Sequence, residues 1–276
     1  MGFRKGRQYA TTWYNRGLHG PSGKYSRIEC FDEALKRDPE YKEAWYEKGL
    51  RHDSEAEEAV KCFDKVIALD PKYEDVWYEK GKALSGLEKY EEAIECFDKA
   101  IELDPDNILS WFKKGVAYFT MAKPTMGDED RKNYEEALKC FEESTKLINT
   151  MEVGAGVISY VVETKPFLAT IKIFIEKGRT FLVLKRPQEA LECFDKALEL
   201  DSEDWKIWHL KSQALQELEK HDESNKCFER SLELGFQPGK EFLYRENPDD
   251  LTAEEAREFQ SNEEKVEDDE FKKDRS

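Results

Sequence analysis

The sequence has no long apolar stretch and none of the short motifs that mark common enzyme classes. No window approaches the roughly 18 consecutive apolar residues of a membrane-spanning helix, so no membrane partner is expected. A glycine-rich phosphate loop, an HExxH pair and a GxSxG elbow are all missing. We therefore expect no enzyme, with no catalytic residue, no metal site and no cofactor.

Basic residues are scarce relative to acidic ones. The chain holds 44 Lys and Arg against 61 Asp and Glu, which gives a formal net charge of −17. Residues 241–276 alone carry 14 acidic and 6 basic side chains. Such an excess repels the phosphate backbone, so nucleic acid is not an expected partner.

Histidine and paired cysteines are too sparse for a zinc site, because the four histidines are scattered and no CxxC occurs. The start of the chain, MGFRKGRQYATT, is basic but is followed by no apolar run, so no secretory signal is predicted. We therefore expect a cytoplasmic location, where thiols stay reduced.

The cysteines that are present mark a repeat. Each is followed by phenylalanine, in the pairs Cys30–Phe31, Cys62–Phe63, Cys96–Phe97, Cys140–Phe141, Cys193–Phe194 and Cys227–Phe228. Each is preceded, 17 to 29 residues earlier, by an aromatic residue: Trp13, Trp45, Trp77, Trp111, Phe174 and Trp208. Four residues beyond each aromatic stands a small residue: Gly17, Gly49, Gly81, Gly115, Gly178 and Ser212. In five copies another small residue stands three residues before the cysteine: Ala59, Ala93, Ala137, Ala190 and Ser224. Without insertions, as from Cys62 to Cys96, the period is 34 residues.

One copy, from Trp77 to Pro105, shows what the pattern predicts. Apolar residues recur at spacings of three and four, first from Trp77 and again from Tyr90, which indicates two short amphipathic helices. Gly81 and Ala93 are small where the two helices approach each other. Asp104-Pro105 ends the second helix, because a residue before proline is disfavoured in helical geometry. Neither helix can bury its apolar face alone, so copies must stack on one another.

A period of 34 with this Trp, Gly, Ala, Phe and Pro pattern resembles the tetratricopeptide repeat over residues 8–236. The resemblance implies an all-α fold: a right-handed α-solenoid of six helix pairs, to which we add a C-terminal capping helix. Stacked repeats place successive cysteines about 10 Å apart, beyond the reach of a disulfide. We therefore expect six buried free thiols.

Spacing and composition divide the chain into six segments. In order, they are a basic frayed N-terminus, a block of four helix pairs, an apolar insertion, a block of two pairs, a capping segment and an acidic disordered tail. Their predicted bounds are residues 1–9, 10–149, 150–165, 166–236, 237–261 and 262–276.

The insertion at residues 150–165 leaves two interpretations open. It is either a covered connector between the two blocks or an exposed apolar flap, through Val157–Val162, that binds a partner or a second copy. Pro166 is placed to start an extended helix that runs to Leu184. Near the end of the chain, Thr252-Ala-Glu-Glu255 forms a capping box and predicts the capping helix over Ala253–Gln260.

In tetratricopeptide proteins the first helix of each pair lines a concave groove that holds an extended peptide. The resemblance places one ladder of residues in that groove: Tyr14, Tyr46, Tyr78, Phe112, Ile175 and His209. Acidic residues surround its first half, at Glu43, Glu47, Asp75 and Glu79. Basic residues lie mostly toward its second half, at Lys82, Lys113, Lys172, Arg179 and Lys206. The ladder rings could instead pack between successive first helices, and both interpretations stay open.

Some proteins of this family grip a C-terminal carboxylate through Lys, Asn and Arg in consecutive repeats. Here the position of that first Lys holds tyrosine in the first three copies, and the Asn position is occupied by Leu18, Leu50 and Lys82. A carboxylate clamp is therefore not expected there and remains conceivable only between Lys172 and Lys206.

The sequence thus predicts a non-catalytic scaffold or adaptor that binds a peptide or helix of another protein in the concave groove. A structural homo-oligomer that self-associates through residues 150–165 is the alternative. An RNA-binding helical repeat is a third possibility, which the acidic charge disfavours.

Overall fold

The computed structural model describes residues 2–20, 25–52, 55–123, 127–155 and 165–237, and these segments contain helices and no strand. Residues up to Phe236 form one compact unit. The all-helical prediction is therefore confirmed. Val157–Val162, the capping helix and the acidic tail lie outside the described residues.

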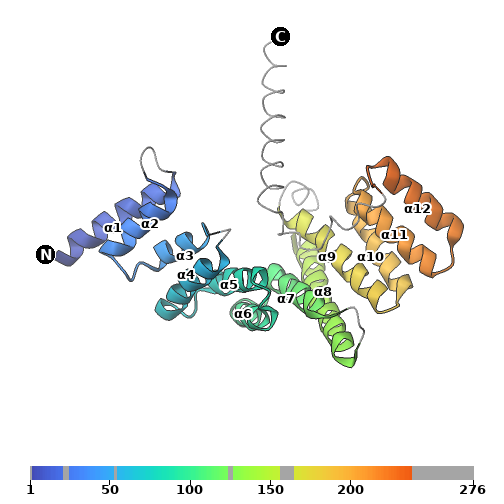
Figure 1. Cartoon of the computed structure of the whole chain (residues 1–276), viewed down its shortest axis with the longest axis horizontal. Coiled ribbons are helices and arrows are strands. Elements are labelled where there is room, and N and C mark those ends of the chain that lie inside the picture. Colours follow the sequence, from blue (N-terminus) through green and yellow to red (C-terminus); the bar gives the residue numbers. More distant parts are fainter. Residues whose placement is uncertain (1, 21–24, 53–54, 124–126, 156–164, 238–276) are drawn as a thin grey trace, which may run out of the picture. The chain divides into compact units, whose positions relative to one another are not determined.

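Twelve helices occur in the part of the chain that the structure describes, and they pack as consecutive pairs (Figure 1). They are α1 (Gly2–Leu18), α2 (Arg27–Arg37), α3 (Lys42–Gly49), α4 (Ala56–Leu69), α5 (Glu74–Gly86), α6 (Tyr90–Leu103), α7 (Ile108–Met121), α8 (Asp128–Ala155), α9 (Lys165–Val183), α10 (Pro187–Leu200), α11 (Trp205–Glu217) and α12 (His221–Glu233). The second helix of each pair also packs against the first helix of the next. This succession is that of an α-solenoid.

A glycine and a phenylalanine close each of the first five pairs. A Cβ atom added to the repeated glycine would lie 2.5 or 2.6 Å from a ring carbon of the phenylalanine that follows the cysteine. In the third pair, these residues are Gly81 and Phe97, and the ring is fully buried. No side chain fits between the two helices at this point, so the glycine is a packing requirement.

The sixth pair replaces the glycine with Ser212, and the small residue of its second helix is Ser224. The Ser224 hydroxyl donates a hydrogen bond of 2.9 Å to the Ser212 carbonyl oxygen. The last pair therefore joins its helices by a buried polar contact where the earlier pairs use tight apolar packing.

Tryptophan fixes the turn between successive repeats. The indole Nε1 of Trp45 donates to the Pro39 carbonyl at 2.9 Å, and Trp77 does the same to Pro71 at 2.9 Å. The aspartate before each proline ends the preceding helix in an extended conformation, as at Asp70. The Asp-Pro stop predicted from the sequence is therefore confirmed, and the tryptophan secures the chain just beyond it.

A lysine column that the sequence interpretation missed joins neighbouring repeats. Lysine three residues beyond the opening aromatic pairs with the acid two residues beyond the cysteine of the preceding repeat. The N–O distances are Lys48–Asp32 2.7 Å, Lys80–Asp64 2.7 Å, Lys114–Asp98 2.5 Å, Lys177–Glu142 4.0 Å and Lys211–Asp195 2.6 Å. The lysines are mostly buried, so these pairs help to set the angle between repeats.

Two helices differ from the bounds predicted for them. Helix α1 begins at Gly2, whereas residues 1–9 were expected to be frayed; no proline interrupts its first turns. Helix α8 is 28 residues long and runs from Asp128 to Ala155, through the boundary predicted at residue 149. Its first turn holds Asp128, Glu129 and Asp130, and their negative charges stabilise the positive N-terminal end of the helix dipole.

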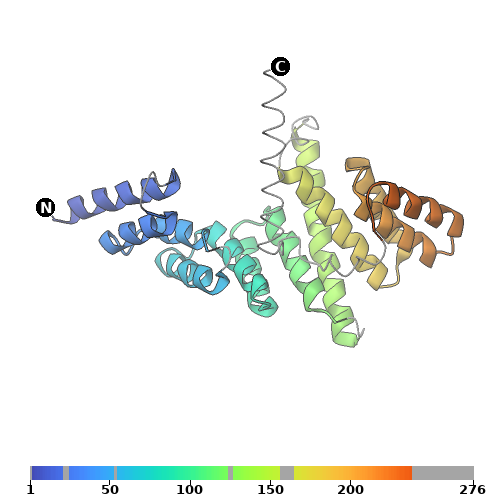
Figure 2. The same cartoon turned by 45° about the horizontal axis from the view of Figure 1, so that its top comes forward.

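Helix α9 confirms the extended first helix of the fifth repeat, with Pro166 in its first turn. It packs against both α8 and α10, and Figure 2 shows it alongside α8. Only residues 156–164 of the predicted insertion separate α8 from α9 in sequence.

All six cysteines lie in the second helix of a pair and are buried and free, as predicted. Burial raises the pKa of Cys96 to about 11 and that of Cys140 to about 12. The thiolate fraction at neutral pH is therefore very small.

Replacing Gly81 with alanine should destabilise the fold by about 1–3 kcal/mol, because the new methyl group overlaps the Phe97 ring. Gly86→Ala, in the same helix, is the matched control: nothing lies within 4 Å of its added Cβ. Urea unfolding followed by circular dichroism measures both. Equal midpoints for the two variants would contradict the packing argument.

The buried thiols should react slowly with Ellman's reagent at neutral pH and all react rapidly in urea. The physical reason is that burial both blocks the reagent and keeps each sulfur protonated. Absorbance at increasing reaction times counts the thiols that have reacted. Fast reaction of several thiols in the native protein would show that the repeats are not closed as described.

Candidate functional site

The ladder residues lie on the first helices and stack against the core of their own repeat. Five of them contact the ring of the phenylalanine that follows the cysteine. The ring-centroid distances are Tyr14–Phe31 6.0 Å, Tyr46–Phe63 6.2 Å, Tyr78–Phe97 6.2 Å, Phe112–Phe141 6.0 Å and His209–Phe228 6.1 Å. The first four ladder rings therefore rest on buried rings, whereas Phe228 beneath His209 is half-buried.

Only part of the ladder remains accessible. Tyr14, Tyr46 and Tyr78 are half-buried, while Phe112 is 4% exposed and belongs to the core. His209 stacks on Phe236, with 4.2 Å between the two ring centroids. Tertiary packing covers Phe112 because Ile173 of the following repeat lies in the same core cluster. The accessible ladder tyrosines thus lie on α1, α3 and α5, and His209 on α11 is half-buried against Phe236.

A second row of tyrosines flanks the first, and the sequence interpretation missed it. Tyr41 lies 4.9 Å from Tyr14, and Tyr73 lies 5.1 Å from Tyr46, measured between ring centroids. Both stand four residues before the opening tryptophan, and that common offset is the signal that could have revealed them. The first two ladder positions are therefore pairs of rings.

Carboxylates surround these tyrosine pairs. Burial, and after it the charge of Glu47, the neighbouring Tyr41 and the charge of Glu43, raise the pKa of Tyr14 to about 12. Burial likewise raises the pKa of Tyr46, with further contributions led by Glu79 and Asp75. The four acids predicted for the first half of the groove therefore act on the ladder hydroxyls.

Two of these acids pair with bases three or four residues further along the chain. Glu47 Oε2 lies 3.4 Å from an Arg51 guanidinium nitrogen, and Glu79 Oε2 lies 3.1 Å from Lys82 Nζ. Lys82 Nζ also lies 5.5 Å from the Tyr78 ring centroid. The predicted groove residue Lys82 is thus engaged with the ladder itself.

The second half carries less unpaired positive charge than the sequence suggested. Arg179 binds Glu176 at 3.1 Å and lies 5.2 Å from the Phe119 ring centroid. Glu176 is only 9% exposed, so this pair is partly buried. Lys113 and Lys172 are half-buried on α7 and α9, and Lys206 Nζ lies 5.8 Å from the Trp205 ring centroid.

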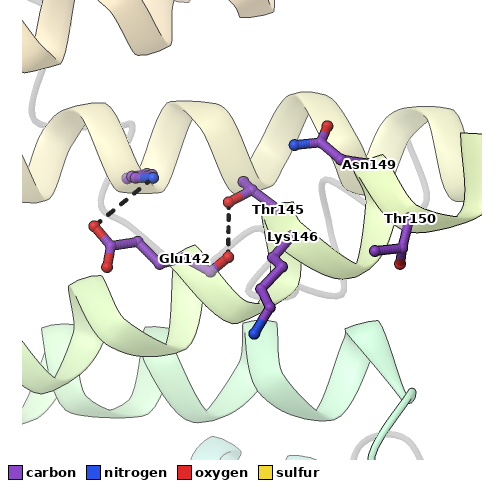
Figure 3. Close-up of a pocket in the computed structure, with 6 residues that line it drawn as sticks. Glu142, Thr145, Lys146, Asn149 and Thr150 are labelled. Atoms are coloured by element: carbon purple, nitrogen blue, oxygen red, sulfur yellow. Dashed lines mark hydrogen bonds and ion pairs between the residues drawn. The ribbon is translucent and has the colours of Figure 1, made fainter. Parts of the chain in front are cut away.

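An open hollow of about 610 Å³ lies beside α8, and no ladder residue lines it (Figure 3). Its lining residues are Glu142, Thr145, Lys146, Asn149, Thr150 and Lys177. Lys146 pairs with Glu143 at 3.0 Å, and Lys177 approaches Glu142 at 4.0 Å. The lining charges are therefore satisfied within the protein.

The described residues contain no group of three or more His, Cys, Asp or Glu placed to hold a metal ion. In the same part of the chain, no helix is both long and apolar enough to cross a bilayer. The tyrosine–carboxylate surface on α1, α3 and α5 is thus the most distinctive polar arrangement on the described first helices.

Sequence profiles of the tetratricopeptide repeat match most of the chain. Separate profiles match residues 28–74, 74–107 and 96–139, and one further profile matches both 171–204 and 206–234. The chain belongs to the tetratricopeptide-repeat family. A search of curated protein sequences gave no significant match.

Solved structures share this tetratricopeptide fold. A crystal structure of MamA protein has a TM-score of 0.56 and 18% identity, covering 76% of this chain and 98% of that one. MamA from Desulfovibrio magneticus RS-1 has a TM-score of 0.56 and 18% identity, covering 70% and 94%. YrrB is described as a TPR protein with an unusual peptide-binding site. Its structure has a TM-score of 0.56 and 16% identity, and the match covers 75% of this chain and 93% of YrrB. Identities this low support the fold alone.

Ionisation of the ladder tyrosines should make the tetratricopeptide fold sensitive to alkali. The pKa of Tyr14 rises from 10.0 to about 12 on folding, so its contribution to stability is complete below pH 10 and is lost as the pH rises toward 12. Urea unfolding of wild type and Tyr14→Phe/Tyr46→Phe at several alkaline pH values measures this effect. The wild type should lose more stability.

Tyr9→Phe is the control, because Tyr9 is 62% exposed on the same helix as Tyr14. It should lose stability in parallel with the wild type. If the double variant also follows the wild type, the phenols are not buried among carboxylates.

Proposed function

We propose that this chain is a non-catalytic protein-interaction scaffold, and that its first helices bind a peptide or helix of a partner protein in the concave groove. One observation carries the proposal. Three half-buried tyrosines, Tyr14, Tyr46 and Tyr78, recur at the same position of α1, α3 and α5, each backed by a buried phenylalanine. Rigid aromatic rings provide contact area at a low cost in conformational entropy.

The family and the charge pattern agree with this function. Proteins of the family are interaction modules, and the structurally similar YrrB is described as having a peptide-binding site. We infer a cytoplasmic location from the free buried thiols, which suit a reducing compartment. The groove residues on the second half, Lys113, Lys172, Arg179 and Lys206, would contact the other end of the bound segment.

The alanine variant Tyr46→Ala/Tyr78→Ala should lose the partners that cross-linking mass spectrometry identifies on the wild type in native extract. The reason is the removal of two of the three accessible ladder rings. Tyr9→Ala/Tyr25→Ala removes two exposed rings elsewhere and is the matched control. Circular dichroism verifies that each variant is folded.

Survival of every partner in the ladder variant would contradict the groove assignment. Self-association through residues 150–165 would be a different function. Light scattering at several concentrations measures the oligomeric state and so distinguishes this alternative from the scaffold function. A monomer at all concentrations excludes that alternative.

A further inference from the structure

The first half of the groove contains two subsites with the same residue types in the same register. Each consists of one ladder tyrosine and, from the next repeat, one flanking tyrosine and two carboxylates. Subsite 1 is Tyr14, Tyr41, Glu43 and Glu47, and subsite 2 is Tyr46, Tyr73, Asp75 and Glu79. The residue types change in the following repeat, where the equivalent positions hold Tyr78, Asn107, Leu109 and Lys113.

The protein's own lysines show what this chemistry binds. Lys42 Nζ lies 2.6 Å from Asp70 and 5.4 Å from the Tyr73 ring centroid. Lys82 repeats the arrangement with Glu79 and the Tyr78 ring. In both cases an ammonium group is held between a carboxylate and the face of a phenol ring.

Tyr14 and Tyr46 lie beside similar carboxylates, but part of that charge is already compensated. Lys42 lies over Tyr73 of subsite 2, and Arg51 and Lys82 pair with Glu47 and Glu79. Among the described residues, no Lys or Arg lies over the Tyr14 or Tyr46 ring, and no ion pair is formed by Glu43 or Asp75. Asp75 is exposed and Glu43 is half-buried. Glu43 and Asp75 thus leave one negative charge beside each of the ladder rings Tyr14 and Tyr46, and a bound cation would neutralise it.

The spacing of the subsites fixes the spacing of the cations. Successive helices in a stack lie about 10 Å apart. A polyproline II chain advances about 3.1 Å per residue with three residues per turn, so side chains three residues apart lie on the same side and span about the same distance. Adjacent residues of such a chain lie about a third of a turn apart and cannot occupy both subsites.

We propose that the groove over α1, α3 and α5 binds a polyproline II segment of a partner protein that carries two Lys or Arg side chains three residues apart. Each cation lies against one tyrosine pair and its carboxylates. Three residues further along, the segment meets Leu109, which is 43% exposed, so an apolar side chain suits that position. This inference rests on the proposed groove function and names the class of segment that the groove accepts.

The test uses short fluorescein-labelled peptides, rich in Gly and Ser, and the full chain. One peptide has two lysines three residues apart, followed by leucine three residues later. A second has the two lysines adjacent, and a third has acetyl-lysine at both original positions. Fluorescence anisotropy at low salt and at about 150 mM salt gives the affinities.

The first peptide should bind most tightly and lose affinity as salt increases. Adjacent lysines should weaken binding about fivefold, and acetylation should weaken it further, because one or both cation contacts are lost. Glu43→Gln/Asp75→Asn should weaken binding of the first peptide about tenfold.

Glu57→Gln/Glu91→Gln changes the net charge equally on exposed positions of α4 and α6 and should leave the affinity unchanged. Equal loss in both variants would mean that only general charge matters, and would overturn the inference. No binding of the first peptide would overturn it as well.

The proposed function can survive that failure. If the Tyr46→Ala/Tyr78→Ala variant still loses a partner whose bound segment contains no such cation pair, the groove binds proteins but does not select cations. If that variant loses no partner, the groove function itself fails.

Discussion

Each of the first five helix pairs closes on a phenylalanine ring that occupies the space a side chain would need on the facing helix. Gly81 and Phe97 show the contact, since an added Cβ would lie 2.6 Å from the ring. This close approach sets the distance between the two helices of a pair. Everything that the pair presents to its neighbours, including the ladder tyrosine that rests on the same ring, depends on it.

Contacts between repeats then transmit this geometry along the chain. Trp77 ties the turn to Pro71 through its indole nitrogen, while Lys80 pairs with Asp64 of the preceding repeat. An ion pair whose acid is more than half exposed contributes little to stability by itself, but it favours one orientation of the two helices. The first helices are thereby held in a fixed register, which fixes the distance between the two tyrosine–carboxylate subsites.

The ladder has the packing role that the sequence left open, and its first three tyrosines also remain accessible for the proposed binding role. Tyr46 packs on the core ring of its own repeat and on Tyr73, yet it remains half-buried and accessible beside Asp75. A ring immobilised in this way loses little freedom when a ligand covers it. Phe112 has the packing role alone, because the next repeat covers it.

The sequence by itself determined the repeat, its helix pairs, the buried thiols and the Asp-Pro stops, because these depend on spacing within one copy. Only the tertiary structure decided that Tyr41 joins Tyr14, that Phe112 is covered, and that Arg179 is paired with a buried glutamate. Those outcomes depend on which side chains meet when one repeat stacks on the next. Periodicity assigns a residue to a helix face, but the neighbouring repeat determines how much of that face remains exposed.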